Sequence, residues 1–214
     1  MPQKGDAPIS VIKRLPVYLR VLDNLVKRDV EVVSSKTLSK ETGFTAEQIR
    51  KDLAFFGAFG TRGTGYTTSY LRERILKIIG LDKQTNVAIV GAGHLGTAFA
   101  RYNIRENPYT KVVGLFDVSP DVVGDELEGV PIYHLDDLSK IVNEYGVQVG
   151  VVTVPAVHAQ DVVDQLVELS IKAILNFAPA KLSAPENVRI HNVDLTIELQ
   201  SLIYFARESI SFAE

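Results

Sequence analysis

The stretch from Asn86 to Ala100 constrains the fold of this chain more than any other segment. A short apolar run, Val87–Val90, is typical of a buried parallel strand and leads directly into Gly-x-Gly-x-x-Gly, followed by residues that can form a helix. This strand–turn–helix context is the one that a dinucleotide fingerprint requires. Its glycines allow a tight turn, the approach of a pyrophosphate and close helix packing, and the phosphates are expected at the helix N-terminus. The cofactor-binding residues expected here are Gly91, Ala92, Gly93, His94, Leu95 and Gly96.

A second apolar strand, 111–116, ends at Asp117, which lies 21 residues after Gly96. A carboxylate at this point would accept hydrogen bonds from both ribose hydroxyls of adenosine and would repel a 2′-phosphate. No arginine follows Asp117 closely, so NAD is favoured over NADP, and Val118 is a further cofactor-binding candidate. The alternative is that Asp117 only caps the segment Val118–Pro120.

The rest of this half alternates strands with helices. The pattern predicts a parallel sheet with helices on both faces, and ligands bind beyond the carboxyl ends of the strands in such sheets. The expected strands are 86–90, 111–116, 148–154, 173–177 and a segment near 188–193, and the expected helices are 94–106, 135–145 and 158–169. Further cofactor-binding candidates at strand ends are Thr153, Val154, Pro155, Asn176 and Phe177. A simple chain reversal is the alternative role for each proline-containing turn.

The net charge of −3 conceals a division of the chain. Residues 1–80 hold 14 Lys and Arg against 8 Asp and Glu, a net charge of +6, whereas residues 81–214 hold 9 against 18, a net charge of −9. Such asymmetry indicates a basic module joined to an acidic one.

The basic half has the pattern of a helix-turn-helix. An apolar stripe from Ile12 to Val26 predicts a first helix, which either starts near Pro16 or kinks there. Segment 34–43 reads as a short helix with a serine N-cap and a terminal glycine, and Thr45 opens the next helix with a capping box. That second helix is the expected recognition helix, with its N-terminal part in a major groove. Its solvent-facing cations are Arg50 and Lys51.

Segment 57–66 is too rich in glycine for a helix and is interpreted as a small hairpin, the wing of a winged helix. Arg62 at its tip is expected to enter a minor groove or to bind phosphate. Solvated surface charge is the alternative for each cation alone, but together, in a basic half, they favour DNA binding. A helix over 69–79 and a polar connector over 80–85 complete this module.

The final helix, 195–212, is apolar around more than one narrow stripe. A helix of this kind is expected to be buried on several sides, either on its own domain or between subunits, and a homodimer interface is favoured.

Residues suited to catalysis are sparse. The chain has no cysteine, its four histidines are scattered, and no cluster has the spacing of metal ligands. This argues weakly against an enzyme and for a DNA-binding protein that senses a cofactor. The lack of an 18-residue apolar run and of a signal-peptide core favours a cytoplasmic protein with no membrane partner.

On these motifs the chain resembles the Rex family of redox-sensing transcriptional repressors along nearly its full length. The matching segments are Arg14–Arg20, Ile49–Gly57, Gly60–Tyr66, Gly91–Gly96, Thr153–Ala156, Ile174–Pro179 and Val193–Leu195. The resemblance implies a homodimer with a winged-helix domain (1–82), a Rossmann domain that binds NAD⁺ and NADH (83–194) and a C-terminal helix (195–214) swapped between subunits. It also implies repression from a double-stranded inverted-repeat operator, relieved by NADH.

The resemblance further assigns roles to single residues. It implies a redox switch formed by Arg20, Tyr102 and Asp194, with Tyr102 also at the cofactor. The DNA contacts that it implies are Arg14, Arg50, Lys51, Thr61, Arg62, Gly63 and Gly65. Two other classes stay open, a small NAD-dependent dehydrogenase and a nucleotide- or CoA-binding module of a larger assembly.

Overall fold

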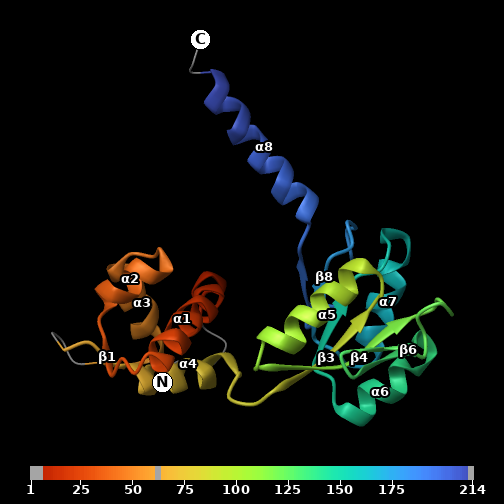
Figure 1. The fold of residues 1–214 in the computed structure, drawn as a ribbon, viewed down its shortest axis with the longest axis horizontal. Helices are drawn as coiled ribbons and strands as arrows, with labels where there is room; N and C mark the ends of the chain where they lie inside the picture. The colour runs from red at the N-terminus through yellow and green to blue at the C-terminus, as the bar shows by residue number, and fades with distance from the viewer. Residues whose placement is uncertain (1–6, 61–63, 212–214) are drawn as a thin grey trace. The chain divides into compact units, whose positions relative to one another are not determined.

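The computed structural model describes residues 7–60 and 64–211, with side chains up to Ala206 in the last helix. Three residues expected to contact DNA, Thr61, Arg62 and Gly63, lie outside the described residues. The chain divides into two compact units, Met1–Lys83 and Gln84–Glu214 (Figure 1).

Unit 1 is built from helices and one small antiparallel sheet. Its described elements are α1 (Ile9–Lys27), β1 (Val32–Val33), α2 (Ser35–Thr42), α3 (Ala46–Phe56), β2 (Tyr66–Thr67) and α4 (Thr68–Ile79). The first helix begins at Ile9 and continues through Pro16, so the proline neither starts nor ends it. Its apolar face is buried at Leu15, Leu19 and Leu22, and this burial holds the helix together where proline removes one backbone hydrogen bond.

The helix-turn-helix has the predicted caps. The Ser34 hydroxyl accepts a hydrogen bond from the Thr37 backbone N–H, and the Thr45 hydroxyl accepts one from the Gln48 N–H. Gly43 ends α2 with φ +76°, a left-handed conformation that glycine adopts at little cost. These local signals fix where α2 ends and α3 begins.

Only part of the expected wing lies within the described residues, so the hairpin itself stays a prediction. The strand that begins at Tyr66 pairs with β1, with Val33 opposite Tyr66, and Gly65 just before it makes a single β-bridge. A side chain on Gly60 would overlap the carbonyl oxygen of Gly65, so the backbones of these two glycines are in close contact. Within the described residues the sheet partner of β2 is therefore β1, which comes from the α1–α2 connection and was not indicated by the sequence pattern.

Unit 2 contains a seven-stranded sheet within its described residues, in the order β5-β6-β4-β3-β7-β8-β9. All neighbours are parallel except β5 and β6. From β6 to β9 this is the Rossmann order, with the crossover point between β3 and β7. The strands are β3 (Thr85–Val90), β4 (Thr110–Asp117), β5 (Glu126–Leu127), β6 (Val130–His134), β7 (Val149–Val152), β8 (Ala173–Asn176) and β9 (Arg189–Asn192).

The sequence pattern identified five of these strands and missed the hairpin of β5 and β6. This hairpin is short and carries Pro131, which pattern reasoning counts against a strand. Its proline is tolerated because β6 uses its other edge, from Ile132 onward, to pair with β4.

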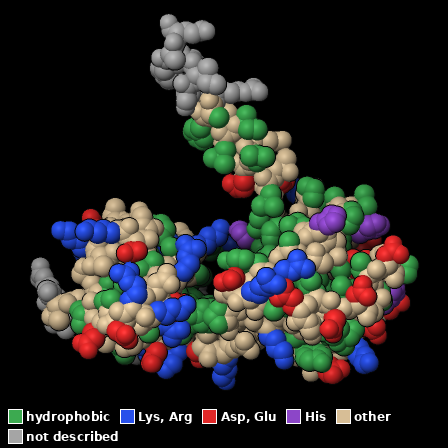
Figure 2. Space-filling view, in the orientation of Figure 1, with side chains coloured by type: hydrophobic (Ala, Val, Ile, Leu, Met, Phe, Trp, Pro, Cys, Tyr) green, Lys and Arg blue, Asp and Glu red, His purple; other side chains and the backbone are tan. Residues whose placement is uncertain are grey.

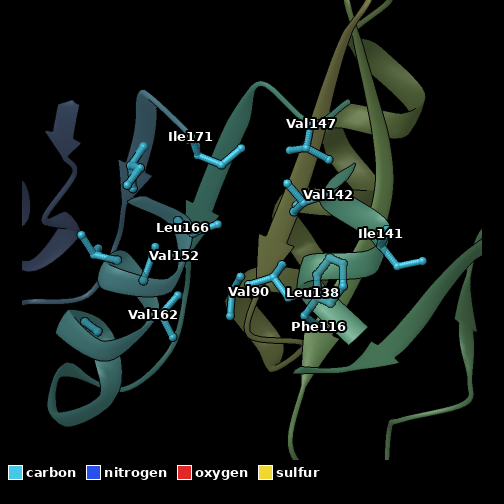
Figure 3. Packing of buried hydrophobic residues seen from close by; sticks show 14 of the residues in the cluster. Val90, Phe116, Leu138, Ile141, Val142, Val147, Val152, Val162, Leu166 and Ile171 are labelled. Atoms are coloured by element: carbon cyan, nitrogen blue, oxygen red, sulfur yellow. The ribbon is translucent and has the colours of Figure 1, made fainter. Parts of the chain in front are cut away.

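Helices cover both faces of the sheet. The remaining elements of unit 2 are α5 (His94–Glu106), the 3-10 turn η1 (Leu135–Asp137), α6 (Leu138–Tyr145), α7 (Ala156–Glu168) and α8 (Leu195–Ser211). Figure 3 shows side chains of α6 and α7 in the same core as those of the strands; labelled members include Leu138, Val162, Val90 and Phe116. The opposite face packs Ala100 of α5 against the strands. The two-faced α/β architecture predicted from the sequence is confirmed.

The last helix forms where the sequence predicts it. Segment 195–211 is helical, but its apolar side chains are exposed in the single chain, with 44–63% of the surface accessible from Leu195 to Phe205. Figure 2 shows these hydrophobic side chains along α8. Of the two alternatives, packing on its own domain would have removed this surface from water and is not observed, whereas the favoured alternative, a homodimer interface, stays a prediction.

No helix among the described residues combines the length and the apolar character needed to cross a membrane.

Candidate nucleotide-binding and DNA-binding sites

The glycine-rich loop joins β3 to α5 at the crossover point of the sheet. Gly91 has φ +108°, and a Cβ built there would lie 2.8 Å from the carbonyl oxygen of Thr153. A Cβ on Gly96 would overlap the carbonyl oxygen of Gly91. These two glycines are therefore required by the packing of the protein itself.

Gly93 is different from the other two glycines of the fingerprint. Its φ of −72° suits any residue, and a Cβ built there would meet no atom within 4 Å. The fold does not require glycine at this position, so the open space in front of it is free for a ligand that approaches the backbone.

The start of α5 is suited to an anion. Gly93 is the N-cap of this 13-residue helix and makes no side-chain capping bond. The first N–H groups of a helix lack intrahelical partners and carry partial positive charge. His94 and Leu95 are exposed in this first turn, where they flank the position expected for a pyrophosphate.

The Asp117 carboxylate connects the end of β4 to the glycine-rich loop. Its Oδ2 accepts a hydrogen bond from the Ala92 N–H at 2.7 Å, and its Oδ1 accepts from the Val118 and Ser119 N–H groups at 2.8 and 3.0 Å. Asp117 therefore does cap the segment that follows it. The same hydrogen bonds hold its half-buried carboxylate at the end of β4, beside the glycine-rich loop. Val118 is exposed next to it.

Thr153 follows β7 and supports the loop from the other side of the crossover. Its hydroxyl lies 2.9 Å from the Gly91 carbonyl oxygen and 3.0 Å from the Val90 carbonyl oxygen. The side chain is thus turned toward the loop, and Pro155 is the N-cap residue of α7. The turn reverses the chain, as the alternative interpretation held, and Val154 packs partly buried against the core.

Asn176, a candidate for the cofactor wall, makes its side-chain hydrogen bonds within the protein. Its side chain is fully buried and donates hydrogen bonds to the Ala178 carbonyl and to Asn192 Oδ1, while its Oδ1 accepts from the Ala178 N–H. The amide is thereby satisfied within the protein, so we assign it to shaping the turn. Phe177 packs edge to face on Phe99 of α5, with ring centroids 5.4 Å apart.

The three expected switch residues lie on different elements. Arg20 is exposed on α1 in unit 1, and Tyr102 is 65% exposed on α5 in unit 2. Asp194 precedes α8, and its Oδ1 accepts hydrogen bonds from the Thr196 and Ile197 N–H groups at 2.9 and 3.1 Å. Asp194 therefore caps the first turn of α8, which was the alternative role for this residue.

The expected recognition helix α3 presents two exposed cations, Arg50 and Lys51. The Arg50 guanidinium donates a hydrogen bond to the Ser35 hydroxyl at 2.9 Å, which links α3 to the first turn of α2. A hollow of about 710 Å³ is lined by Ser35 and Arg50 and also by Phe59 and Gly65. Figure 2 shows Lys and Arg side chains spread over this view of unit 1, with fewer Asp and Glu side chains among them.

Arg14, expected at DNA, makes a paired hydrogen bond within unit 1, and its contact with DNA stays a prediction. Its Nε and Nη2 donate hydrogen bonds to the two carboxylate oxygens of Asp52 at 2.6 and 2.8 Å, and its guanidinium lies over the Phe44 ring. The Tyr18 hydroxyl and the Gln48 amide also donate to this carboxylate. We therefore assign Arg14 to holding α1 against α3.

Asp52, which is 1% exposed, is the residue that sequence reasoning missed. A signal was available, because Asp52 lies three residues after Ile49 on the apolar face of α3, where a charge requires a partner. Burial acts to raise the pKa of its carboxyl, but the hydrogen bonds from Arg14, Tyr18 and Gln48 outweigh it and hold the pKa below its ordinary value. The stabilisation that this carboxylate gives is therefore present above its unfolded-state pKa and lost as the pH falls through the folded-state value.

The fold and the two sites together define the class: a winged-helix protein that carries its own Rossmann nucleotide-binding domain. Family models agree with this division, since one described as "Putative DNA-binding protein N-terminus" matches residues 6–54 and one described as a CoA binding domain matches residues 82–180.

Relatives then identify the family. The chain is 82% identical over 211 residues to the redox-sensing transcriptional repressor Rex of Natranaerobius thermophilus, with 99% of this chain and 96% of the relative covered. It is 47% identical to Rex of Listeria monocytogenes over 96% of this chain and 95% of the relative. This chain belongs to the Rex family of redox-sensing transcriptional repressors. The relatives are named as repressors and not as enzymes.

Solved structures agree over the whole chain. The Rex-family repressor RSP in complex with β-NAD⁺ and operator DNA matches with a TM-score of 0.88 and 38% identity, covering 96% of this chain and 95% of RSP. RSP in complex with β-NADH matches with a TM-score of 0.83 and 37% identity, covering 97% of each chain.

Proposed function

We propose that this chain is a cytoplasmic transcriptional repressor that binds an inverted-repeat operator as a homodimer and is released from it by NADH. One observation carries the proposal: the chain joins an exposed basic recognition helix to a fingerprint whose Gly93 is open to a ligand and not needed by the fold. The operator and both nicotinamide nucleotides bound by RSP support it. We assign residues 1–82 to a winged-helix DNA-binding domain and residues 83–194 to a Rossmann domain that binds NAD(H). Residues 195–214 are assigned to the helix that is swapped between subunits.

The residues at the crossover point fit a dinucleotide. The N–H groups at the start of α5 would hold the pyrophosphate, and the Asp117 carboxylate would accept from the adenosine ribose. The remaining candidates, Val118, Thr153, Val154, Pro155 and Phe177, lie at the carboxyl ends of the strands or next to them. When bound, the nicotinamide supplies a change of one unit of charge between its oxidised and reduced forms.

Coenzyme A is the second candidate ligand, because a CoA binding family model covers unit 2. CoA and NAD share adenosine diphosphate, so the same loop and helix would suit both. They differ at the adenosine ribose, where CoA carries a phosphate on the 3′-oxygen in place of one of the two hydroxyls that would donate hydrogen bonds to Asp117. A carboxylate repels that phosphate, which favours NAD.

We further propose that Asp194 reads the charge of the nicotinamide. In a site that excludes water, a single carboxylate interacts strongly with one unit of charge. Loss of that attraction with NADH would free Asp194 to pair with Arg20 and would favour a second arrangement of the domains. A change from a mostly DNA-competent to a mostly incompetent population requires roughly 5 kcal/mol of differential binding.

The function is tested by selecting duplexes from a random DNA pool with the wild-type chain and titrating NAD⁺ and NADH into the complex. We expect an inverted repeat to be enriched, NADH to release it and NAD⁺ to retain it. In Lys51→Ala, which removes an exposed cation of α3, binding of the same duplex should weaken by about tenfold. Failure to enrich any duplex, or equal binding with both nucleotides, would contradict the proposal.

The role of Asp194 is separated from its capping bond by two substitutions. Asp194→Asn keeps an oxygen that can cap α8 but removes the charge, whereas Asp194→Ala removes both. If the charge acts as proposed, both variants should need at least about tenfold more NADH for half-release of the operator in a fluorescence anisotropy titration. A normal NADH response in Asp194→Asn together with an impaired one in Asp194→Ala would instead leave Asp194 as a cap alone.

A further inference from the structure

The cluster around Asp52 is the strongest feature that the proposed function leaves unused. Four side chains meet there: Asp52 and Gln48 come from α3, and Arg14 and Tyr18 come from α1. We propose that Asp52 is a positioning residue for DNA recognition, which fixes the rotation of α3 about its own axis through its paired hydrogen bonds with Arg14. This inference rests on the proposed function and adds a residue to which the sequence analysis assigned no role.

The geometry of the pair is directional. Arg14 contacts both carboxylate oxygens through two different nitrogens, at 2.6 and 2.8 Å, so the planes of the two groups are fixed relative to each other. The Tyr18 hydroxyl at 2.6 Å and the Gln48 amide at 2.8 Å occupy further positions on the same oxygens. Apolar contacts between helices specify distance but tolerate small rotations, whereas this arrangement does not.

Rotation matters because the DNA-facing cations are the immediate neighbours of Asp52. Arg50 and Lys51 precede it on α3 and are exposed, while Asp52 itself is buried. A helix with its side chains has a radius of about 5–6 Å, so a rotation of about 30° moves a surface group by about 3 Å. That displacement is as large as a hydrogen bond, and it would break base contacts while leaving the positive charge near the phosphates.

The same pair connects the two ends of the proposed signal within unit 1. The first helix carries Arg20, the proposed switch residue, six positions after Arg14. Because α1 is continuous from Ile9 to Lys27 and is bonded to Asp52, any displacement of α1 is transmitted to α3. Asp52 thus places the recognition helix under the control of the helix that would receive the redox signal.

The test is a double variant, Arg14→Met with Asp52→Leu. It removes one charge of each sign, so the net charge of unit 1 is unchanged, and apolar replacement of a buried ion pair is often neutral for stability. We expect a cooperative thermal transition and unchanged NADH affinity. We expect affinity for the duplex selected by the wild-type protein to fall by at least about 30-fold, and affinity for a scrambled duplex to stay within about threefold.

If Asp52 only stabilised the fold, its loss would not weaken binding of the selected duplex more than binding of the scrambled duplex. Equal losses on both duplexes, or retention of specific binding by the folded variant, would overturn the inference. A wild-type chain that fails to distinguish the two duplexes would instead contradict the proposed function.

Two further variants keep the test decisive if the double variant does not fold. Tyr18→Phe removes one hydrogen bond to Asp52 and keeps the ring, and we expect it to weaken specific binding at least about threefold without affecting the scrambled duplex. An unchanged specific affinity would overturn the inference. The matched control is Asp23→Asn with Arg72→Gln, which breaks the ion pair between α1 and α4 and should change specific binding less than twofold, whereas a loss equal to that of Tyr18→Phe would count against a special role for Asp52.

Discussion

Replacement of Gly93 by valine should yield a folded repressor that binds its operator but no longer responds to NADH. The backbone at Gly93 has φ −72° and ψ −173°, which valine adopts readily, and no atom lies within 4 Å of the position of its Cβ. The cost to stability is expected to be about 1 kcal/mol or less, from the weaker N-cap. The added methyl groups would occupy the space through which a pyrophosphate approaches the N–H groups of α5.

The expected size of this effect follows from the hydrogen bonds that are lost. A hydrogen bond from a backbone N–H to a charged phosphate contributes about 1.5–3 kcal/mol, so loss of two such bonds weakens NADH binding by at least about 100-fold. Isothermal titration calorimetry measures the NADH affinity, and anisotropy of the labelled operator in the presence of NADH measures the response. Normal NADH affinity in Gly93→Val would place the cofactor elsewhere.

Gly96→Ala is the matched comparison within the same motif. Its Cβ would overlap the Gly91 carbonyl oxygen, so this smaller substitution should lower the melting temperature of unit 2, whereas the larger one at Gly93 should not. The contrast between these two variants tests the division of the fingerprint into glycines that the fold requires and one that the ligand requires.

The Rossmann sheet could be predicted from the sequence because its signals are local. Each signal predicts one element from a few consecutive residues. These signals are the apolar run Val87–Val90, the spacing of the glycines and the end of the next strand at Asp117. The caps at Ser34 and Thr45 are equally local. The hairpin of β5 and β6 was missed because Pro131 is acceptable only through its place at the antiparallel edge, which is a property of the sheet.

The site required information that the sequence pattern does not carry. Arg14 was assigned to DNA by the family resemblance, whereas its partner Asp52 lies 38 residues away and is reached only when α1 packs on α3. Asn176 occupies the end of a strand, as expected of a ligand-binding residue, but its amide bonds to Ala178 and Asn192. In both cases a polar side chain was assigned to a ligand although the folded chain itself provides the partner.

The apolar surface of α8 should be covered by a second copy of the chain, and charges placed there should separate the dimer. Leu199 and Leu202 are 60% and 63% exposed in the single chain, and contiguous exposed apolar surface of this kind is typical of an interface. In Leu199→Glu with Leu202→Glu, each subunit would have to bury two carboxylates without partners, at a cost of several kcal/mol for each. In sedimentation equilibrium we therefore expect this variant to be a monomer and the wild type to be a dimer.

Loss of the dimer should also remove most operator binding. A dimer engages two half-sites at once, so the second contact is made at high effective concentration, whereas a monomer has to bind each half-site alone. We expect the affinity for the inverted repeat to fall by more than about 100-fold while the affinity of unit 2 for NADH stays within severalfold. The matched control is Gln200→Glu, which adds a charge on the same helix without removing an apolar side chain and should leave both the dimer and its operator affinity intact. If the double variant remained a dimer, subunit assembly would have to depend on some other surface, and the apolar character of α8 would need a different partner.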